Sequence, residues 1–159
     1  MFYGTEVTET FTSPDNWTPG TTTPKTVVVK NTGDVDVAVR VKYTEAWESA
    51  NGGTLSGTQG ANQAATINFA NATDWTKSGD YYYYKSKLSK NQSTSSFISS
   101  VTFNSNITSD TNCTTSGNVT TCATTGDGYD GATYTLTITA ETIQYDAYTT
   151  AWTSAVTIN

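Results

Sequence analysis

The stretch Val35-Asp36-Val37-Ala38-Val39-Arg40-Val41-Lys42-Tyr43 decides the fold class. Its odd positions are apolar and its even positions are mostly polar, which is the period of two of an extended strand. The stretch therefore predicts a strand with one buried face and one wet face, and Arg40 falls on the wet face, where an ion pair contributes little.

Other segments have the same strand character and are separated by turns rich in Gly, Asn and Asp. The expected strands are residues 1–11, 25–30, 66–69, 80–85, 96–103, 119–124, 133–144 and a short closing strand at 152–158. The segment at 25–30 should form a hairpin or adjacent sandwich strands with the one at 35–43. Residues 49–63 are too polar to pack and predict a long surface loop. The sequence thus indicates an all-β protein, a jelly-roll-like β-sandwich.

Length and charge limit the possible functions. A chain of 159 residues is about one domain long, and its net charge is -6 with only 8 Lys and Arg. These basic residues do not cluster, so a phosphate-binding surface is missing and we expect no nucleic-acid partner. No apolar run reaches the roughly 18 residues of a membrane span, which predicts no membrane insertion of the mature chain.

Two cysteines, Cys113 and Cys122, flank a strong turn signal at Ser116-Gly117-Asn118. If that turn closes a hairpin, the two thiols face each other at a separation that a disulfide can span. A metal or redox pair is the alternative, but the spacing is not C-x-x-C and the chain has no histidine to complete a zinc site. A disulfide would place the protein in an oxidising compartment.

The residues for common enzymatic mechanisms are missing. Without histidine there is no Ser-His-Asp or Cys-His hydrolysis and no H-E-x-x-H metalloprotease site. Carboxylate pairs could in principle act alone, but scattered acidic residues on such a surface more often solvate it. Asp34-Val35-Asp36 and Asp127-Gly128-Tyr129-Asp130 offer oxygen ligands for calcium, and each reads better as a turn. We therefore expect a protein that is not an enzyme, with no catalytic residues, cofactor or metal.

Aromatic residues suggest a second class of function. In the run Tyr81 to Tyr84, alternation sends two rings into the core and two outward. The outward pair, together with Trp47 and Trp75, would form the platform of a monomeric secreted or cell-surface binding module for a carbohydrate or protein ligand. Such a module predicts an N-terminus packed within its own domain.

Six asparagines open N-x-[S/T] sequons and are possible glycosylation sites: Asn16, Asn71, Asn91, Asn106, Asn112 and Asn118. A chain so rich in Asn, Ser and Thr also produces sequons by chance, so both interpretations stay open.

Several stretches, in order along most of the chain, resemble one family, the exported TasA and camelysin-like proteins of Gram-positive bacteria, whose export depends on a specialised signal peptidase. The matching residues are Trp17-Thr18-Pro19-Gly20, Lys25, Val27 to Val41 with Asn31-Thr32-Gly33-Asp34, Gly79-Asp80-Tyr81-Tyr82-Tyr83-Tyr84-Lys85, Ser99-Ser100-Val101-Thr102-Phe103 and Thr139-Ala140-Glu141-Thr142-Ile143-Gln144-Tyr145-Asp146. Some camelysin-like relatives are described as metalloproteases, and the missing histidines argue against that activity here. The polar loop at 49–63 and the cysteine hairpin depart from the family pattern.

The resemblance implies a subunit of an extracellular pilus-like or biofilm-matrix fibre, located outside the cell or at its surface after removal of a signal peptide. Its partners would be copies of itself, with matrix or cell-surface components as further candidate partners. Residues 1–12 would be a projecting donor strand, and 13–159 a single sandwich domain whose sheet the next subunit's strand completes. In strand addition, main-chain hydrogen bonds provide affinity and alternate side chains provide register. The expected polymerisation residues are Phe2, Tyr3, Thr5, Val7, Glu9 and Phe11.

Overall fold

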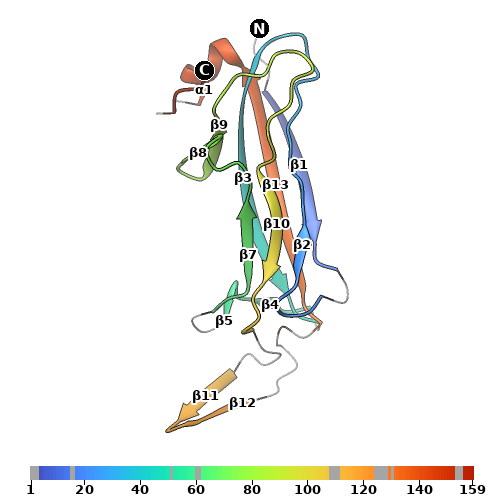
Figure 1. The fold of residues 1–159 in the computed structure, drawn as a ribbon, viewed down its shortest axis with the longest axis vertical. Helices are drawn as coiled ribbons and strands as arrows, with labels where there is room; N and C mark the ends of the chain where they lie inside the picture. The colour runs from blue at the N-terminus through green and yellow to red at the C-terminus, as the bar shows by residue number, and fades with distance from the viewer. Residues whose placement is uncertain are drawn as a thin grey trace.

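The computed structural model describes residues 4–14, 17–50, 52–59, 62–107, 112–123, 129, 131–152 and 156–159. Strands dominate these residues, and one short helix follows the last strand (Figure 1). The strands are β1 (Gly4–Thr12), β2 (Thr22–Pro24), β3 (Val37–Glu48), β4 (Thr54–Leu55), β5 (Thr58–Gln59), β6 (Asn62–Gln63), β7 (Ala65–Phe69), β8 (Trp75–Ser78), β9 (Tyr81–Tyr84), β10 (Ile98–Phe103), β11 (Asn112–Ser116), β12 (Val119–Ala123) and β13 (Thr133–Gln144). A 3-10 turn η1 (Tyr145–Ala147) leads into the helix α1 (Tyr148–Ala151).

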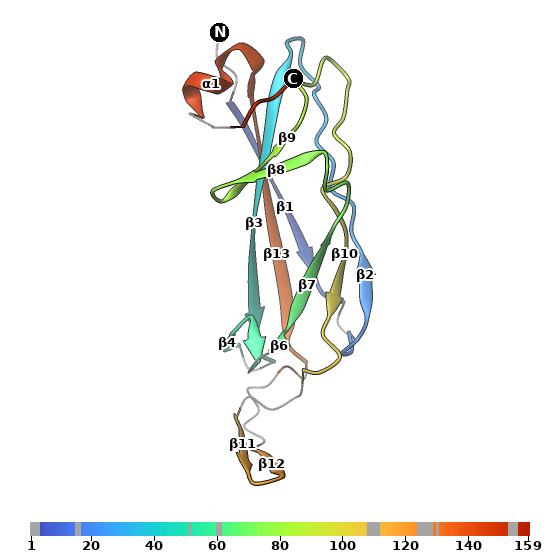
Figure 2. The ribbon, with the colours of Figure 1, turned by 60° about the vertical axis from the view of Figure 1, so that its left-hand side comes forward.

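Two antiparallel sheets pack into a sandwich-like arrangement, which confirms the all-β prediction. The larger sheet has six strands in the order β1-β13-β3-β9-β8, with β4 also paired to β3. The smaller sheet has the order β2-β10-β7. The long strands β3 and β13 pair over twelve residues, from Val37 opposite Gln144 to Glu48 opposite Thr133. They make the sandwich elongated along the strand direction (Figure 2).

The core lies between the two sheets and follows the predicted alternation. On β3 the odd residues Val37, Val39 and Val41 are buried in it, and Tyr43 packs against it. The even residues of β13 lie beside them on the same face of the large sheet; these are Tyr134, Leu136 and Ile138. The residues that face them from the smaller sheet are Ile67 of β7 and Ile98, Val101 and Phe103 of β10. Each strand therefore contributes one apolar face, as a period of two requires.

A second, smaller cluster covers the opposite face of the large sheet. Ala38, Tyr83 and Ile143 lie on that face, and Tyr148 and Ile158 from the C-terminal segment pack on them. The Asn159 N–H donates to the carbonyl of Lys85 at 2.9 Å, and the Lys87 N–H donates to the carbonyl of Asn159 at 2.6 Å. The end of the chain is thus held beside β9. Of the expected closing strand at 152–158, the described residues 152 and 156–158 carry no strand.

Residues 25–30 are extended but do not form a regular strand, although the sequence predicted one. They run along residues 93–99, and hydroxyl groups replace two of the carbonyl acceptors that a regular ladder would use. The Val27 N–H donates to Ser96 Oγ at 3.1 Å, and the Val29 N–H donates to Thr94 Oγ1 at 3.0 Å. This segment continues the small-sheet layer, so it lies opposite β3 in the sandwich and does not form a hairpin with it.

The polar stretch at 49–63 also differs from a structureless loop, since it holds the short strands β4, β5 and β6. β5 and β6 pair with each other, and β4 pairs with the end of β3. β11 and β12 form a separate hairpin that extends beyond the end of the sandwich opposite the C-terminal segment (Figure 1). No helix among the described residues is long and apolar enough to cross a membrane.

Candidate assembly interface

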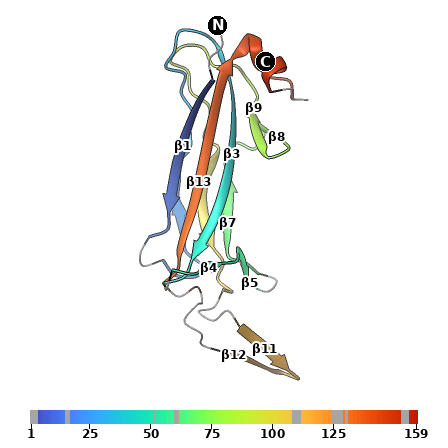
Figure 3. The ribbon, with the colours of Figure 1, turned by 180° about the vertical axis from the view of Figure 1, so that it is seen from behind.

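The N-terminal strand β1 lies at the edge of the large sheet, paired with β13 of its own chain (Figure 3). The pairing is antiparallel and runs over nine residues, from Gly4 opposite Ile143 to Thr12 opposite Thr135. The register partners of the predicted polymerisation residues are Thr142 for Thr5, Ala140 for Val7, Ile138 for Glu9 and Leu136 for Phe11. Phe2 and Tyr3 lie outside the described residues.

The single chain thus differs from the expected projecting strand, because residues 4–12 complete their own sheet. The physical reason is the edge of β13, which would otherwise expose a row of unpaired N–H and C=O groups. Pairing with a strand of the same chain satisfies these groups. Within the described part of the chain, β1 itself has no partner on its outer side, so it is the edge strand.

Side-chain contacts hold the C-terminal half of β1 in place, in addition to its backbone pairing. Phe11 is 9% exposed, and its ring contacts the ring of Tyr134 edge-on at a centroid distance of 6.2 Å. Just beyond the strand, the Ser13 N–H donates to the Tyr134 carbonyl at 2.9 Å. The Tyr134 N–H donates in return to Ser13 Oγ at 3.0 Å. This end of β1 is anchored on the main core.

The connector after β1 is short and anchored at its far end. The indole Nε1 of Trp17 donates to the Ala132 carbonyl at 2.6 Å, and the ring packs on Trp47 at 5.4 Å and on Phe103 at 4.9 Å. Trp17 therefore belongs to the sandwich body. Only a few residues between Ser13 and Trp17 separate that anchor from β1.

The acceptor strand β13 changes character along its length. Tyr134, Leu136 and Ile138 are buried, whereas Ala140 and Thr142 are half-buried. Beside these last two residues lies a cavity of about 370 Å³, lined also by the loop through residues 29–35. The N-terminal half of β1 pairs with this less densely packed part of β13, so we expect opening to begin there.

The predicted cysteine hairpin is formed. Cys113 and Cys122 are register partners in the antiparallel pair β11–β12, on either side of a turn in which Gly117 has a φ of 59°. That positive φ is the left-handed region that glycine enters without strain. The disulfide itself stays a prediction.

Four of the six sequon asparagines lie on the described surface. Asn71, Asn91, Asn106 and Asn118 are exposed, and the side chains of Asn16 and Asn112 fall outside the described residues. Asn71 and Asn91 adopt positive φ values of 52° and 66° at turns, which asparagine tolerates better than most residues. Their exposure makes these four sites accessible, and glycosylation stays a prediction.

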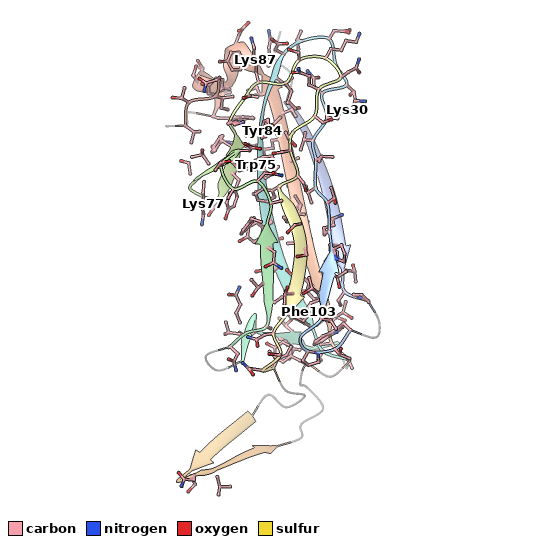
Figure 4. The ribbon with its side chains drawn as sticks, in the orientation of Figure 1. Lys30, Trp75, Lys77, Tyr84, Lys87 and Phe103 are labelled. Atoms are coloured by element: carbon pink, nitrogen blue, oxygen red, sulfur yellow. The ribbon has the colours of Figure 1, made fainter. Side chains whose placement is uncertain are left out.

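Trp47 and Trp75 do not form the aromatic platform of the alternative binding module, which corrects that part of the prediction, whereas the packing of β1 in its own sheet is what that module predicts. Trp47 is 4% exposed and Trp75 is 7% exposed, and both belong to the main core. Figure 4 shows Trp75 beside Tyr84, and their ring centroids are 5.0 Å apart. The alternation of the tyrosine run is as predicted, but the outward ring of Tyr83 is buried under the C-terminal segment.

Arg40, which the sequence placed on a wet face, was wrongly predicted to be exposed. It lies on the expected face of β3, yet its side chain is only 15% exposed. Its Nε donates to Glu141 Oε2 at 2.5 Å, and its guanidinium carbon lies 3.9 Å from the ring centroid of Tyr81 and 4.5 Å from that of Trp152. Burial tends to lower the pKa of Arg40, but bonds to Tyr83 and Glu141 raise it overall, so the group stays charged.

The acidic turn Asp34-Val35-Asp36 is engaged by lysines. Lys90 Nζ lies 2.5 Å from Asp34 Oδ1, and Lys87 Nζ lies 3.2 Å from Asp36 Oδ2. A hydrogen bond from Ser89 and the contact with Lys87 lower the pKa of Asp36. Among the described residues no cluster of three or more His, Cys, Asp or Glu could hold a metal ion. These two carboxylates therefore serve as ion-pair partners within the chain.

Comparisons of the chain with protein-family models, with curated proteins and with solved structures found no significant match.

Proposed function

We propose that this chain is a structural subunit of an extracellular fibre, in which β1 leaves its own sheet and pairs with β13 of the next subunit. One observation carries the proposal: a terminal edge strand holds a nine-residue register with a core strand and is joined to the body by a short connector. The same contact can form between two molecules without any new interaction, which is the definition of a strand exchange.

Strand exchange that does not close into a ring produces a polymer. If each subunit receives a strand on one side and donates its own on the other, the contact is head-to-tail and does not close. The exchanged strand lies antiparallel to β13, along the long axis of the sandwich (Figure 3). A pull along that axis loads the ladder bonds together in shear, which suits a fibre that bears tension.

Concentration and opening should control the exchange. The donated strand makes the same contacts in both states, so closed chains dominate whenever the protein concentration is below the effective concentration of the tethered strand. For a short tether that value is on the order of millimolar. We therefore expect fibres after concentration, or after mild denaturant has opened β1, and closed monomers in dilute solution.

Negative-stain electron microscopy of the purified, concentrated protein tests the proposal. We expect regular filaments that shorten when an excess of a synthetic peptide of residues 1–12 is present during assembly, because the peptide occupies β13 without offering a further acceptor. A peptide of the same composition in scrambled order is the control. Dispersed particles under all conditions, or filaments indifferent to the peptide, would refute it.

A further inference from the structure

The strand β3 has an unpaired edge in its middle. On one side all twelve residues pair with β13. On the other side β9 pairs only with Arg40 and Val41, and β4 pairs only with Trp47 and Glu48. Within the part of the chain that the structure describes, residues 42–46 are paired with no strand on that side. We call residues 42–46 the β3 notch.

The charged side chains of the β3 notch do not protect its edge. Natural sheets often use lysine or glutamate to block an open edge. Here Lys42 Nζ lies 5.4 Å from the ring centroid of Tyr81, and Glu45 Oε1 accepts a hydrogen bond from the Tyr134 hydroxyl at 2.7 Å. Both charged groups are directed to partners of their own chain. On the side away from β13, alternate residues of the notch therefore present their backbone N–H and C=O groups to an added strand, and no charged side chain blocks them.

An exposed aromatic ring lies beside the notch. Phe69, at the end of the edge strand β7, is 41% exposed and packs against Tyr43 at 6.0 Å and Tyr82 at 5.5 Å. It is one of three large apolar side chains on the described surface that are exposed, with Val28 and Val119. An added strand with an apolar side chain would cover it.

The shape of the notch restricts what can enter. The β8–β9 pair continues the sheet beyond β3 above the notch, and β4 does so below it, so the open edge is recessed between them (Figures 2 and 3). The flank of a second sandwich would meet these pairs first. A slender strand that stands away from its own domain would fit between them.

The hairpin β11–β12 is such an element. It extends beyond the sandwich, and among the described residues its two strands pair only with each other. Residues 112–123 contain no charged side chain that would block an edge. Val119, the first residue of β12, is 64% exposed, so its apolar side chain is accessible to a second molecule.

We infer that the hairpin of one copy docks in the β3 notch of a second copy. Each hairpin strand has five residues and the notch has five, a length of roughly 16 Å. Docking along β12 pairs the open groups of two unprotected edges and brings Val119 to Phe69. The two surfaces are different parts of the chain, so the contact is head-to-tail. It is independent of the exchange of β1 and would join subunits or neighbouring fibres.

Photo-cross-linking tests the contact on the full chain. A benzophenone amino acid replaces Val119, and the labelled protein is mixed with an equal amount of ¹⁵N-labelled wild type so that cross-links between molecules are identified by mass. We expect intermolecular cross-links to residues 42–46 or Phe69. No intermolecular cross-link at the highest attainable concentration, or cross-links only to other parts of the surface, would overturn the inference.

Matched variants give a second readout. Val119→Lys and Thr44→Lys should each weaken self-association by roughly tenfold in sedimentation equilibrium, because each places a charge where two edges must meet. Val28→Lys adds the same charge at another exposed valine and should leave the association unchanged. Equal effects of all three variants would refute docking at this site.

A staple separates this contact from the proposed fibre junction. Cysteines at Thr10 and Thr137 would hold β1 on its own β13, and the cross-link yield from Val119 should not change. If the yield falls with the staple, the hairpin contact is a by-product of strand exchange and the inference of an independent interface is wrong.

Discussion

Phe11 of β1 packs its ring edge-on against Tyr134 of β13, with 6.2 Å between the ring centroids. Phe11 is 9% exposed and Tyr134 is fully buried, so this contact joins the edge strand to the main core. The Phe11→Ala variant should lower the free energy of unfolding by about 3 kcal/mol, since it removes a buried ring and leaves a cavity. Urea denaturation measures it, and Thr10→Ala, an exposed neighbour on the same strand, is the control. A loss below about 1 kcal/mol would show that β1 is not packed as described.

The Arg40 site should behave as one enclosed unit. Arg40→Gln removes the bond to Glu141 and the contacts with the rings of Tyr81 and Trp152, and we expect it to cost about 2 kcal/mol. Arg40→Lys should recover less than half of this loss, because an ammonium cannot replace the planar group at the ring faces. A double-mutant cycle with Glu141→Gln isolates the coupling between the two charged groups. Additive effects in that cycle would show that the ion pair contributes nothing.

The hydroxyl acceptors beside residues 25–30 should contribute to stability. Thr94→Val deprives the Val29 N–H of its hydroxyl acceptor, and Ser96→Ala does the same for Val27. Each change should cost about 1 to 2 kcal/mol in urea denaturation, because a partly buried donor loses its partner. Ser93→Ala, at an exposed serine on the same segment, should change little. If Thr94→Val leaves the free energy of unfolding unchanged, the N–H of Val29 must have another acceptor.

Stability should fall in alkali between pH 10 and about pH 12. Burial, and then the neighbouring Tyr82, raise the pKa of Tyr43 to about 12 from an ordinary value of 10.0. A pKa raised on folding means that the folded state keeps its proton longer, so the contribution is complete below pH 10 and is lost as pH rises through 12. From pH 8 to pH 11 the Tyr43→Phe variant should lose less free energy of unfolding than the wild type. The difference between the two losses should be at most about 2 kcal/mol. Parallel curves would contradict the assignment.

Reduction of the predicted disulfide should act locally. Because the hairpin pairs only with itself among the described residues, Cys113→Ser together with Cys122→Ser should change the unfolding free energy of the sandwich by less than about 0.5 kcal/mol. The same change should speed proteolytic cleavage within residues 112–123, which limited proteolysis with mass spectrometry detects. A large loss of global stability would mean that the hairpin packs on the sandwich.

Much of the sandwich could be predicted from alternation alone. Val39 and Val41 are buried and β13 spans Thr133–Gln144 as expected, because a period of two over many residues has no other stable arrangement. The cysteine hairpin was also predictable, since its turn chemistry is local. The segment at 25–30 was harder, because Ser96 and Thr94 accept its bonds from a distant part of the sequence.

The outer face of the large sheet could not be predicted from the strand pattern. A polar residue such as Arg40 marks a wet face only if nothing covers it, and the C-terminal segment covers this one. Trp47 and Trp75 were wrongly predicted to be exposed for a related reason. The sequence around a single aromatic residue does not show which residues of the opposite sheet will cover it. The place of β1 depends on whether β13 finds a strand in its own chain or in another, and the sequence of β1 is the same in both cases.

The most direct measurement of the central claim is electron microscopy of a chain whose β1 is stapled to its own β13. Thr10 and Thr137 are register partners, and opposed residues of an antiparallel pair lie within the separation that a disulfide spans. Thr22 and Thr102, register partners in the smaller sheet, provide the control staple. If β1 exchange builds the fibre, the oxidised Thr10→Cys/Thr137→Cys protein gives only dispersed particles, and the control staple gives filaments like the wild type. Filaments from the oxidised β1 staple, with the bond verified by mass spectrometry, would contradict the claim.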